Sequence, residues 1–144
     1  VFQYINDTLA VSCVQHDYTP TCSVKMAGLI QTKYPRKNWS SLMLFNCSHP
    51  NTKKLSVDAV NTQSPAWLHR MLWADDSEIG SIPVEYNYLV GYYHHTQEPT
   101  AIHFTDGGPW HPGYGDVEFG DRWLKYLSID EKEKMDKEIR DYYV

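Results

Sequence analysis

The sequence has 144 residues, enough for one domain with a sizeable core, and its 42% hydrophobic and 22% charged residues are ordinary for a globular protein. We therefore predict one folded domain over residues 1–144. The formal net charge of −5 argues against a nucleic-acid-binding surface, and no apolar run reaches the roughly 20 residues of a transmembrane segment. Cys13, Cys22 and Cys47 lack C-x-x-C spacing, so they indicate neither a disulfide framework nor a zinc site and favour a reducing, cytoplasmic setting.

Two strands are predicted in the first third of the chain. The run over residues 8–14 is mostly apolar, which is typical of a strand buried on both faces of a mixed sheet. The run over residues 40–46 is the next predicted strand. Residues 21–37 between them carry Gly28 and Pro35 among basic residues and show no clear period, so we expect an irregular excursion with one short helical piece.

Three helices are predicted from the residues that begin them. A short helix is expected after Ser56, a typical N-cap residue. A second helix is expected over residues 65–73, where Ser64 is the N-cap and a proline fills the first helical position. Ser128, followed three residues later by a glutamate, resembles a capping box. It predicts an amphipathic terminal helix over residues 128–144 whose apolar face docks on the core or on a partner.

The second half of the chain is predicted to alternate between extended and helical segments. Residues 85–93 alternate imperfectly and lead to a loop at the adjacent His94 and His95, which point in different directions and are interpreted as structural or incidental. Residues 101–105 predict a short strand that leads directly into a glycine-rich loop. Residues 116–126 are predicted to be helical, with aromatic side chains on one side.

The strand and loop at residues 101–115 form the main candidate site. A strand that ends in a glycine-rich loop is where α/β proteins usually place ligands. Two adjacent glycines allow close backbone approach and positive φ angles. The loop offers a potential metal ligand, a carboxylate, a stacking surface and a second imidazole, which are His103, Asp106, Trp110 and His111. The structural alternative is a tight turn with a buried tryptophan behind it.

Two further clusters carry chemistry. Asp75, Asp76 and Glu78 form an acidic run that can bind a sugar hydroxyl or act as a base, or that can be a solvated turn. Residues 36–41 bring basic and small polar groups to the start of a strand. They can hold a phosphate, or they can be a strand edge with solvated charges.

Together these clusters resemble the nucleotide-sugar glycosyltransferases of GT-A fold, of the glycogenin and bacterial lipopolysaccharide galactosyltransferase type. The run H-F-T-D-G-G-P-W at residues 103–110 is similar to that family's H-F-x-G-x-x-K-P-W motif, shortened by one residue. The run N-W-S-S-L-M-L-F-N at residues 38–46 is similar to its F-N-S-G-V-M-L-F-N strand. Residues 75–87 echo its D-Q-D-x-L-N and L-P-x-x-W-N motifs, and the three motifs follow in the family's order across residues 38–110, about half of the chain.

The resemblance implies an α/β fold, with a mixed sheet and flanking helices, that is part of a GT-A-like fold. It implies transfer of a sugar from a nucleotide-sugar donor to a glycan acceptor with the help of Mn²⁺ or Mg²⁺. It implies that His103 is a metal ligand and that Asp75 and Asp76 are catalytic. The implied substrate-binding residues are Trp39, Ser40, Asn87, Asp106, Gly107, Gly108 and Trp110.

The sequence departs from the family pattern in three places. Gly108 replaces the lysine that contacts the diphosphate, so this charge is missing unless Arg36, Lys37 or Lys125 supplies it. Trp39 takes the place of the strand asparagine. The metal-binding D-x-D is absent and would lie upstream of the first residue. We therefore expect the C-terminal, acceptor-side part of a larger transferase, inactive by itself, which self-associates to cover its exposed seam and sheet edge.

A non-catalytic function is the alternative. The chain contains 5 Trp and 11 Tyr, many for its length, and such side chains stack on sugars but also fill cores and interfaces. This surplus and the acidic charge fit a carbohydrate-binding or structural, virion-associated module equally well. An inactive remnant of a transferase is a third possibility. Sugar binding without metal dependence would favour the module.

Overall fold

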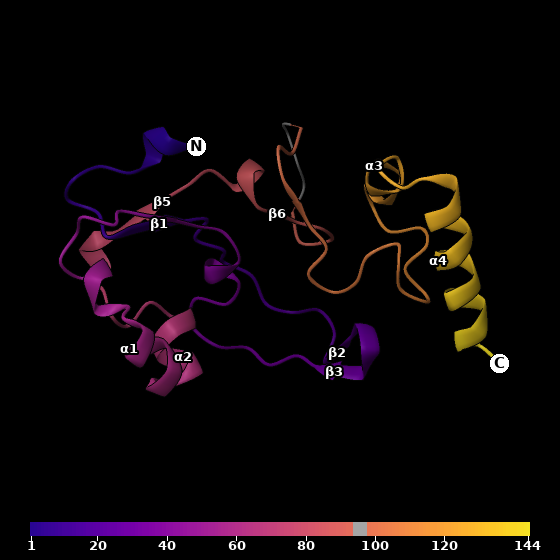
Figure 1. Ribbon diagram of the computed structural model, residues 1–144, viewed down its shortest axis with the longest axis horizontal. Helices are drawn as coiled ribbons and strands as arrows, with labels where there is room; N and C mark the ends of the chain where they lie inside the picture. Colours follow the sequence, from indigo (N-terminus) through magenta and orange to yellow (C-terminus); the bar gives the residue numbers. More distant parts are fainter. Residues whose placement is uncertain (94–97) are drawn as a thin grey trace.

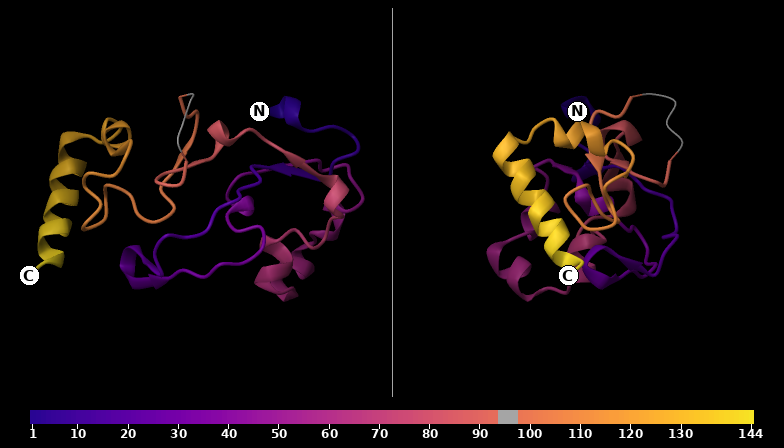
Figure 2. Two further views of the ribbon diagram at one scale, coloured as in Figure 1. Left: turned by 180° about the vertical axis from the view of Figure 1, so that it is seen from behind. Right: turned by 90° about the vertical axis from the view of Figure 1, so that its right-hand side faces the viewer.

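The computed structural model describes residues 1–93 and 98–144 of the protein. Over these residues the fold is mixed α/β, with three small sheets, short helices and one longer C-terminal helix. Both views across the long axis show an elongated molecule, with the three-stranded sheet towards one end and the C-terminal helix at the other (Figures 1 and 2). The predicted loop at His94 and His95 lies outside the described residues. The strands of the described residues form several small sheets, whereas one mixed sheet was expected.

The three-stranded sheet is made of β1 (Val11–Cys13), β4 (Met43–Phe45) and β5 (Ile79–Ser81), in the order β4-β1-β5. The central strand β1 pairs antiparallel with β4 and parallel with β5, so the sheet is mixed. All three residues of β1 are buried. The buried strand predicted over residues 8–14 is therefore confirmed at its centre. The strand predicted over residues 40–46 is regular only from Met43 on.

Two short helices, α1 (Val57–Thr62) and α2 (Pro65–His69), lie at the same end of the molecule as the three-stranded sheet (Figure 1). Both begin at the predicted caps, because the hydroxyl of Ser56 accepts the N–H of Ala59 and the hydroxyl of Ser64 accepts the N–H of Trp67, each at 3.1 Å. The second helix was predicted to reach residue 73 but ends at His69.

The early end of α2 allows the residues that follow it to enter the hydrophobic core. Met71 adopts a left-handed φ of 51°, which turns the chain out of the helix. Met71 and Trp73 then lie among the buried side chains of β1 and β5. Sequence periodicity favoured a longer helix, but burial of these two large side chains decides the geometry.

The two smaller sheets bring the candidate site together. The hairpin of β2 (Val24–Lys25) and β3 (Leu29–Ile30) lies within the segment that was predicted to be irregular, and it projects from the molecule (Figure 1). The strands β6 (Tyr88–Leu89) and β7 (Ile102–His103) pair in parallel, with Leu89 opposite His103. The strand predicted over residues 101–105 therefore exists, but its ladder is two residues long.

The C-terminal part consists of α3 (Gly120–Leu124) and α4 (Ile129–Tyr142). The predicted capping box of α4 is confirmed, because the Ser128 hydroxyl accepts the N–H of Glu131 and the Glu131 carboxylate accepts the N–H of Ser128. The helix predicted over residues 116–126 is regular only within α3. Short 3-10 turns link the described elements: η1 (Phe2–Tyr4), η2 (Met26–Gly28), η3 (Trp39–Ser41), η4 (Thr52–Lys54), η5 (Asp76–Glu78) and η6 (Val84–Tyr86).

Candidate functional site

The carboxylate of Asp106 holds three distant segments together. Its Oδ1 accepts a hydrogen bond from the amide of Gln31 at 2.7 Å, and its Oδ2 accepts one from the hydroxyl of Tyr92 at 2.7 Å. Its backbone carbonyl accepts the N–H of Met26 at 2.9 Å. The loop after β7 is thereby fixed to the β2–β3 hairpin and to the segment after β6. The pKa of Tyr92 is raised by burial and by its bond to this carboxylate.

Asn38 connects the same loop to the segment after β1. Its amide donates to the hydroxyl of Tyr18 at 2.6 Å and to that of Thr105 at 2.8 Å. Burial raises the pKa of Tyr18 to about 12, so this phenol keeps its proton at neutral pH. The rings of Tyr18 and Tyr92 meet edge to face with 4.5 Å between centroids. Two tyrosine hydroxyls and a fixed amide therefore lie beside Asp106.

His16 forms the buried side of this arrangement. Its Nδ1 lies 2.7 Å from the hydroxyl of Tyr93, and its Nε2 lies 3.0 Å from the amide nitrogen of Asn87. Burial, and then the nearby His103, lower the pKa of His16 to about 4. The ring is therefore neutral, and the tautomer that accepts from Asn87 at Nε2 donates from Nδ1 to Tyr93. The indole of Trp39 donates to the backbone carbonyl of His16 at 2.9 Å.

These side chains form one unit, which we call the polar cluster. It consists of His16, Tyr18, Asn38, Trp39, Asn87, Tyr92, Thr105 and Asp106. Trp39, Asn87 and Asp106 were predicted from three separate motifs. His16 and Tyr18 were missed as site residues, although they directly follow the buried strand β1, where ligands of α/β proteins often bind.

His103 lies at the end of β7, next to the polar cluster. Its side chain is half-buried, and burial together with the nearby charge of Lys25 holds its pKa below the usual range. The neutral imidazole that results is the form that binds metals. Among residues 1–93 and 98–144, however, no three His, Cys, Asp or Glu side chains lie close enough to hold a metal ion. The described residues therefore do not fit a complete Mn²⁺ or Mg²⁺ site.

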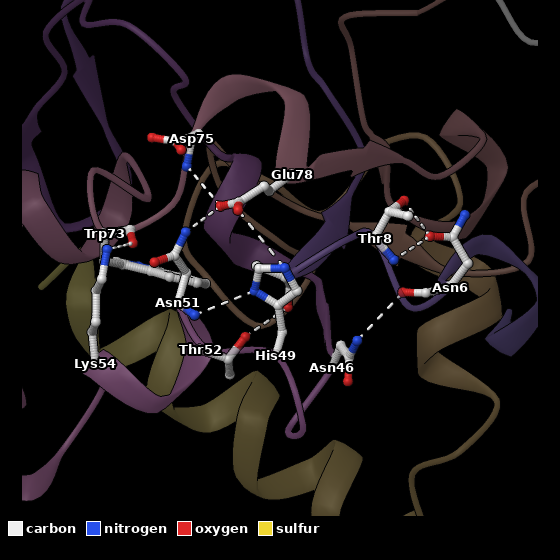
Figure 3. A network of polar contacts seen from close by, with 11 residues as sticks. Asn6, Thr8, Asn46, His49, Asn51, Thr52, Lys54, Trp73, Asp75 and Glu78 are labelled. Carbon is white, nitrogen blue, oxygen red and sulfur yellow. Dashed lines mark hydrogen bonds and ion pairs between the residues drawn. The ribbon is translucent and has the colours of Figure 1, made fainter.

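The acidic run at residues 75–78 is involved in local structure (Figure 3). Glu78 accepts the amide of Asn51 and, at 3.0 Å, the backbone N–H of Asp75, and these bonds lower its pKa. Asp75 in turn caps the 3-10 turn η5. Asp76 is exposed and pairs with Arg36, whose guanidinium lies 5.5 Å from the ring centroid of Trp39. Of the predicted catalytic pair, Asp76 thus contacts the polar cluster through Arg36, whereas Asp75 serves the turn η5.

Ser40 and the two glycines of the loop have structural partners. The hydroxyl of Ser40 lies 3.0 Å from Nδ1 of His69, at the end of α2. A Cβ at Gly107 would lie 2.5 Å from the ring of Tyr114, and one at Gly108 would lie 2.2 Å from the ring of Trp110. Neither glycine has a positive φ, so that expectation was wrong. Both are needed because aromatic rings pack on the backbone there.

An aromatic pocket lies beside β7. It has a volume of about 330 Å³, and Ile102 and Phe104 line it together with Phe119, Trp123, Tyr126 and Arg122. Successive side chains of a strand point to opposite faces. Ile102 and Phe104 face this pocket, so the side chain of His103 between them points to the other face. The predicted stacking residue Trp110 contacts the pocket wall, with its ring 5.6 Å from Phe104 and 4.8 Å from Trp123.

Comparison with known proteins shows similarity to a plant protein. The sequence is 51% identical to Protein CDI of Arabidopsis thaliana over 134 residues, which are 90% of this chain and 52% of the relative. The chain therefore spans about half the length of the curated relative that it matches. No protein-family model matches the sequence, and no solved structure gives a significant match. Within the described part of the chain, no helix is long and apolar enough to cross a membrane.

Proposed function

We propose that the chain is a glycosyltransferase-like domain that contributes to the transfer of a sugar from a nucleotide-sugar donor to a glycan acceptor. One observation carries the proposal. Trp39, Asn87 and Asp106 come from three separate stretches that resemble transferase motifs, and they lie in one polar cluster with His103 beside it. Chance resemblances would not be expected to converge in space.

The chemistry of the cluster fits a ligand rich in hydroxyl groups. Asp106 offers carboxylate oxygens and Tyr18 offers a protonated phenol, while the amides of Asn38 and Asn87 already donate within the cluster and hold it in shape. Such a set can accept and donate hydrogen bonds at the same time, as sugar hydroxyls require. A divalent metal remains part of the proposal: His103 would supply one nitrogen ligand, and further ligands would have to come from outside the described residues.

An assay of nucleotide release tests this function. The natural protein that carries this sequence is incubated with UDP-glucose or UDP-galactose, with Mn²⁺ or with EDTA, and free UDP is measured. We expect release that needs Mn²⁺ and that falls about 100-fold in His103→Ala, in line with loss of a group that stabilises the leaving diphosphate. His69→Ala, an exposed histidine on α2, should leave the rate unchanged. Release that is equal in the two variants would reject the proposed role of His103.

The aromatic pocket favours a second candidate, a non-catalytic carbohydrate-binding module. Aromatic rings beside charged groups are typical of sugar-binding surfaces, and this pocket includes Trp123, Tyr126 and Arg122. The module predicts binding of simple glycans without nucleotide or metal, and loss of that binding in Trp123→Ala. The transferase predicts that nucleotide-sugar binding survives this substitution.

The cysteines indicate the redox state of the compartment in which the protein is located. All three thiols are unpaired, and Cys22 and Cys47 are exposed. Exposed thiols persist in reducing compartments and become oxidised outside them. We therefore propose a cytoplasmic location, to be tested by following a tagged copy of the natural protein in cell fractions.

A further inference from the structure

A second pocket adjoins the polar cluster and is lined by cations. It has a volume of about 290 Å³ and is lined by His16 and Tyr18 from the cluster together with Lys33, Tyr34, Arg36 and Lys37. We call it the basic pocket. Asp17 is the one acidic residue in its lining, and its side chain is exposed. Arg36 is paired with Asp76 outside the lining, so Lys33 and Lys37 against the exposed carboxylate of Asp17 leave the pocket positive.

The positive charge is concentrated in a chain that is acidic overall. The formal net charge is −5, yet residues 18–57 contain no Asp or Glu. The same stretch carries a series of basic residues, which are Lys25, Lys33, Arg36, Lys37, Lys53 and Lys54. A local excess of this kind attracts anions, and a concave wall strengthens the effect.

Two of the three cations are held in defined positions. Arg36 donates to the carbonyl of Arg70 at 2.6 Å and pairs with Asp76, which fixes its guanidinium over Trp39. The ammonium of Lys37 lies 4.8 Å from the ring centroid of Tyr34. Burial and the charge of Lys25 lower the pKa of Lys37, whereas Asp106 raises it. The charges of Lys25 in the hairpin and of Asp106 in the polar cluster therefore both act on Lys37. A bound anion would reduce the repulsion between Lys37 and Lys25.

We propose that the basic pocket binds the phosphate groups of a phosphorylated small molecule, with Lys33 and Lys37 as the contacts to the anion and Arg36 as its fixed wall. This inference rests on the proposed function in one respect, which is that the phosphates belong to the diphosphate of a nucleotide-sugar. The pocket shares His16 and Tyr18 with the polar cluster, so a diphosphate held here leaves its sugar beside Asp106. It also supplies the positive charge that glycine at position 108 lacks.

Titration calorimetry with sodium pyrophosphate tests the site without any sugar or nucleotide. The natural protein is titrated in EDTA, at low salt and at physiological salt. We expect saturable binding that weakens about 5- to 10-fold in Lys33→Gln and in Lys37→Gln, and further in the double variant, since each removes one direct charge contact. Lys53→Gln is the matched control, because Lys53 is an exposed lysine of the same acid-free stretch outside the pocket.

The outcomes separate this site from the proposed function. Absence of saturable binding, or equal weakening in Lys37→Gln and Lys53→Gln, overturns the inference, because equal weakening would mean only long-range attraction. If pyrophosphate binds through Lys37 but UDP-glucose and UDP-galactose do not bind, the anion site stands and the proposed function fails. If a UDP-sugar binds with an affinity that Lys33→Gln and Lys37→Gln leave unchanged, the anion site fails and the proposed function stands.

Discussion

At the scale of single residues, His16 links stability to pH. Its folded-state pKa is about 4, against an ordinary value of 6.5. Between these two values the unfolded chain binds more protons than the folded one, so stability is full above pH 6.5 and is lost as pH falls towards 4. We expect the free energy of unfolding, measured by urea titration, to drop on the order of 2 kcal/mol between about pH 7 and about pH 4.5.

Two variants show whether His16 causes this loss. His16→Gln should be less stable than the natural sequence at neutral pH, because it disturbs the bonds to Tyr93 and Asn87, but its stability should depend much less on pH. His69→Gln, at an exposed position, should keep the full pH dependence. A pH dependence that is unchanged in His16→Gln would assign the effect to other groups.

Sequence motifs located several residues of the site but not what they bind. Asp106 and Asn87 were predicted, whereas the bridging role of Asn38 was not, because its partner Thr105 is 67 positions away in the chain. Pairings of this range come from tertiary packing and leave no local pattern. The loop glycines were predicted for their backbone freedom, whereas at Gly107 the structure requires space for the ring of Tyr114.

At the scale of elements, contact between β1 and β5 depends on Gly80. It lies opposite Ser12 in the parallel pair, and a Cβ there would lie 2.3 Å from the Ser12 hydroxyl and 2.7 Å from a methyl group of Leu9. We expect Gly80→Ala to lower the free energy of unfolding by about 1–3 kcal/mol, the usual cost of overpacking. Gly115→Ala, where no atom lies within 4 Å of the added Cβ, should change it by less than about 0.5 kcal/mol. Equal urea midpoints for the two variants would contradict this account.

The starts of α1, α2 and α4 were predictable from sequence, but the start of α3, the helix ends and the short strands were not. Ser56, Ser64 and Ser128 act locally, through hydrogen bonds within the first turn, so sequence alone reveals them. The end of α2 is set by the turn at Met71 into the core, which is a tertiary effect. The two-residue strands of the β2–β3 hairpin are too short to show a period.

At the scale of the whole molecule, the β2–β3 hairpin is a surface suited to self-association. It projects from the body (Figure 1), and Ile30 is 79% exposed while Leu29 is 52% exposed. Open strand edges with apolar side chains favour pairing between chains. We expect sedimentation equilibrium of the 144-residue chain to give a mass above 16.8 kDa that rises with concentration. Ile30→Lys should reduce this association, whereas Thr32→Lys, an exposed polar neighbour, should have little effect. A mass of 16.8 kDa at every concentration would contradict the prediction.

The global arrangement was predictable only in outline. The apolar run of β1 and the resemblance to GT-A transferases predicted a mixed α/β fold, and the structure is of this class. The pairing of Val11 with Ile79 and the division into three small sheets depend on long-range contacts that no single stretch encodes. The likeness to a GT-A transferase was derived from motifs alone, and it stays a proposal that binding experiments have to decide.

The most direct test of that proposal is the binding of a nucleotide-sugar. UDP-glucose and UDP-galactose are titrated calorimetrically into the natural protein that carries this sequence, with Mn²⁺ and with EDTA, and the titrations are repeated on His103→Ala and His69→Ala. We predict saturable binding with Mn²⁺ that weakens at least about 10-fold in EDTA and in His103→Ala, since EDTA would remove the proposed metal and the substitution its proposed nitrogen ligand, and that is unchanged in His69→Ala. Absence of binding to both nucleotide-sugars, or equal affinity in His103→Ala and the unsubstituted protein, would contradict the proposed function.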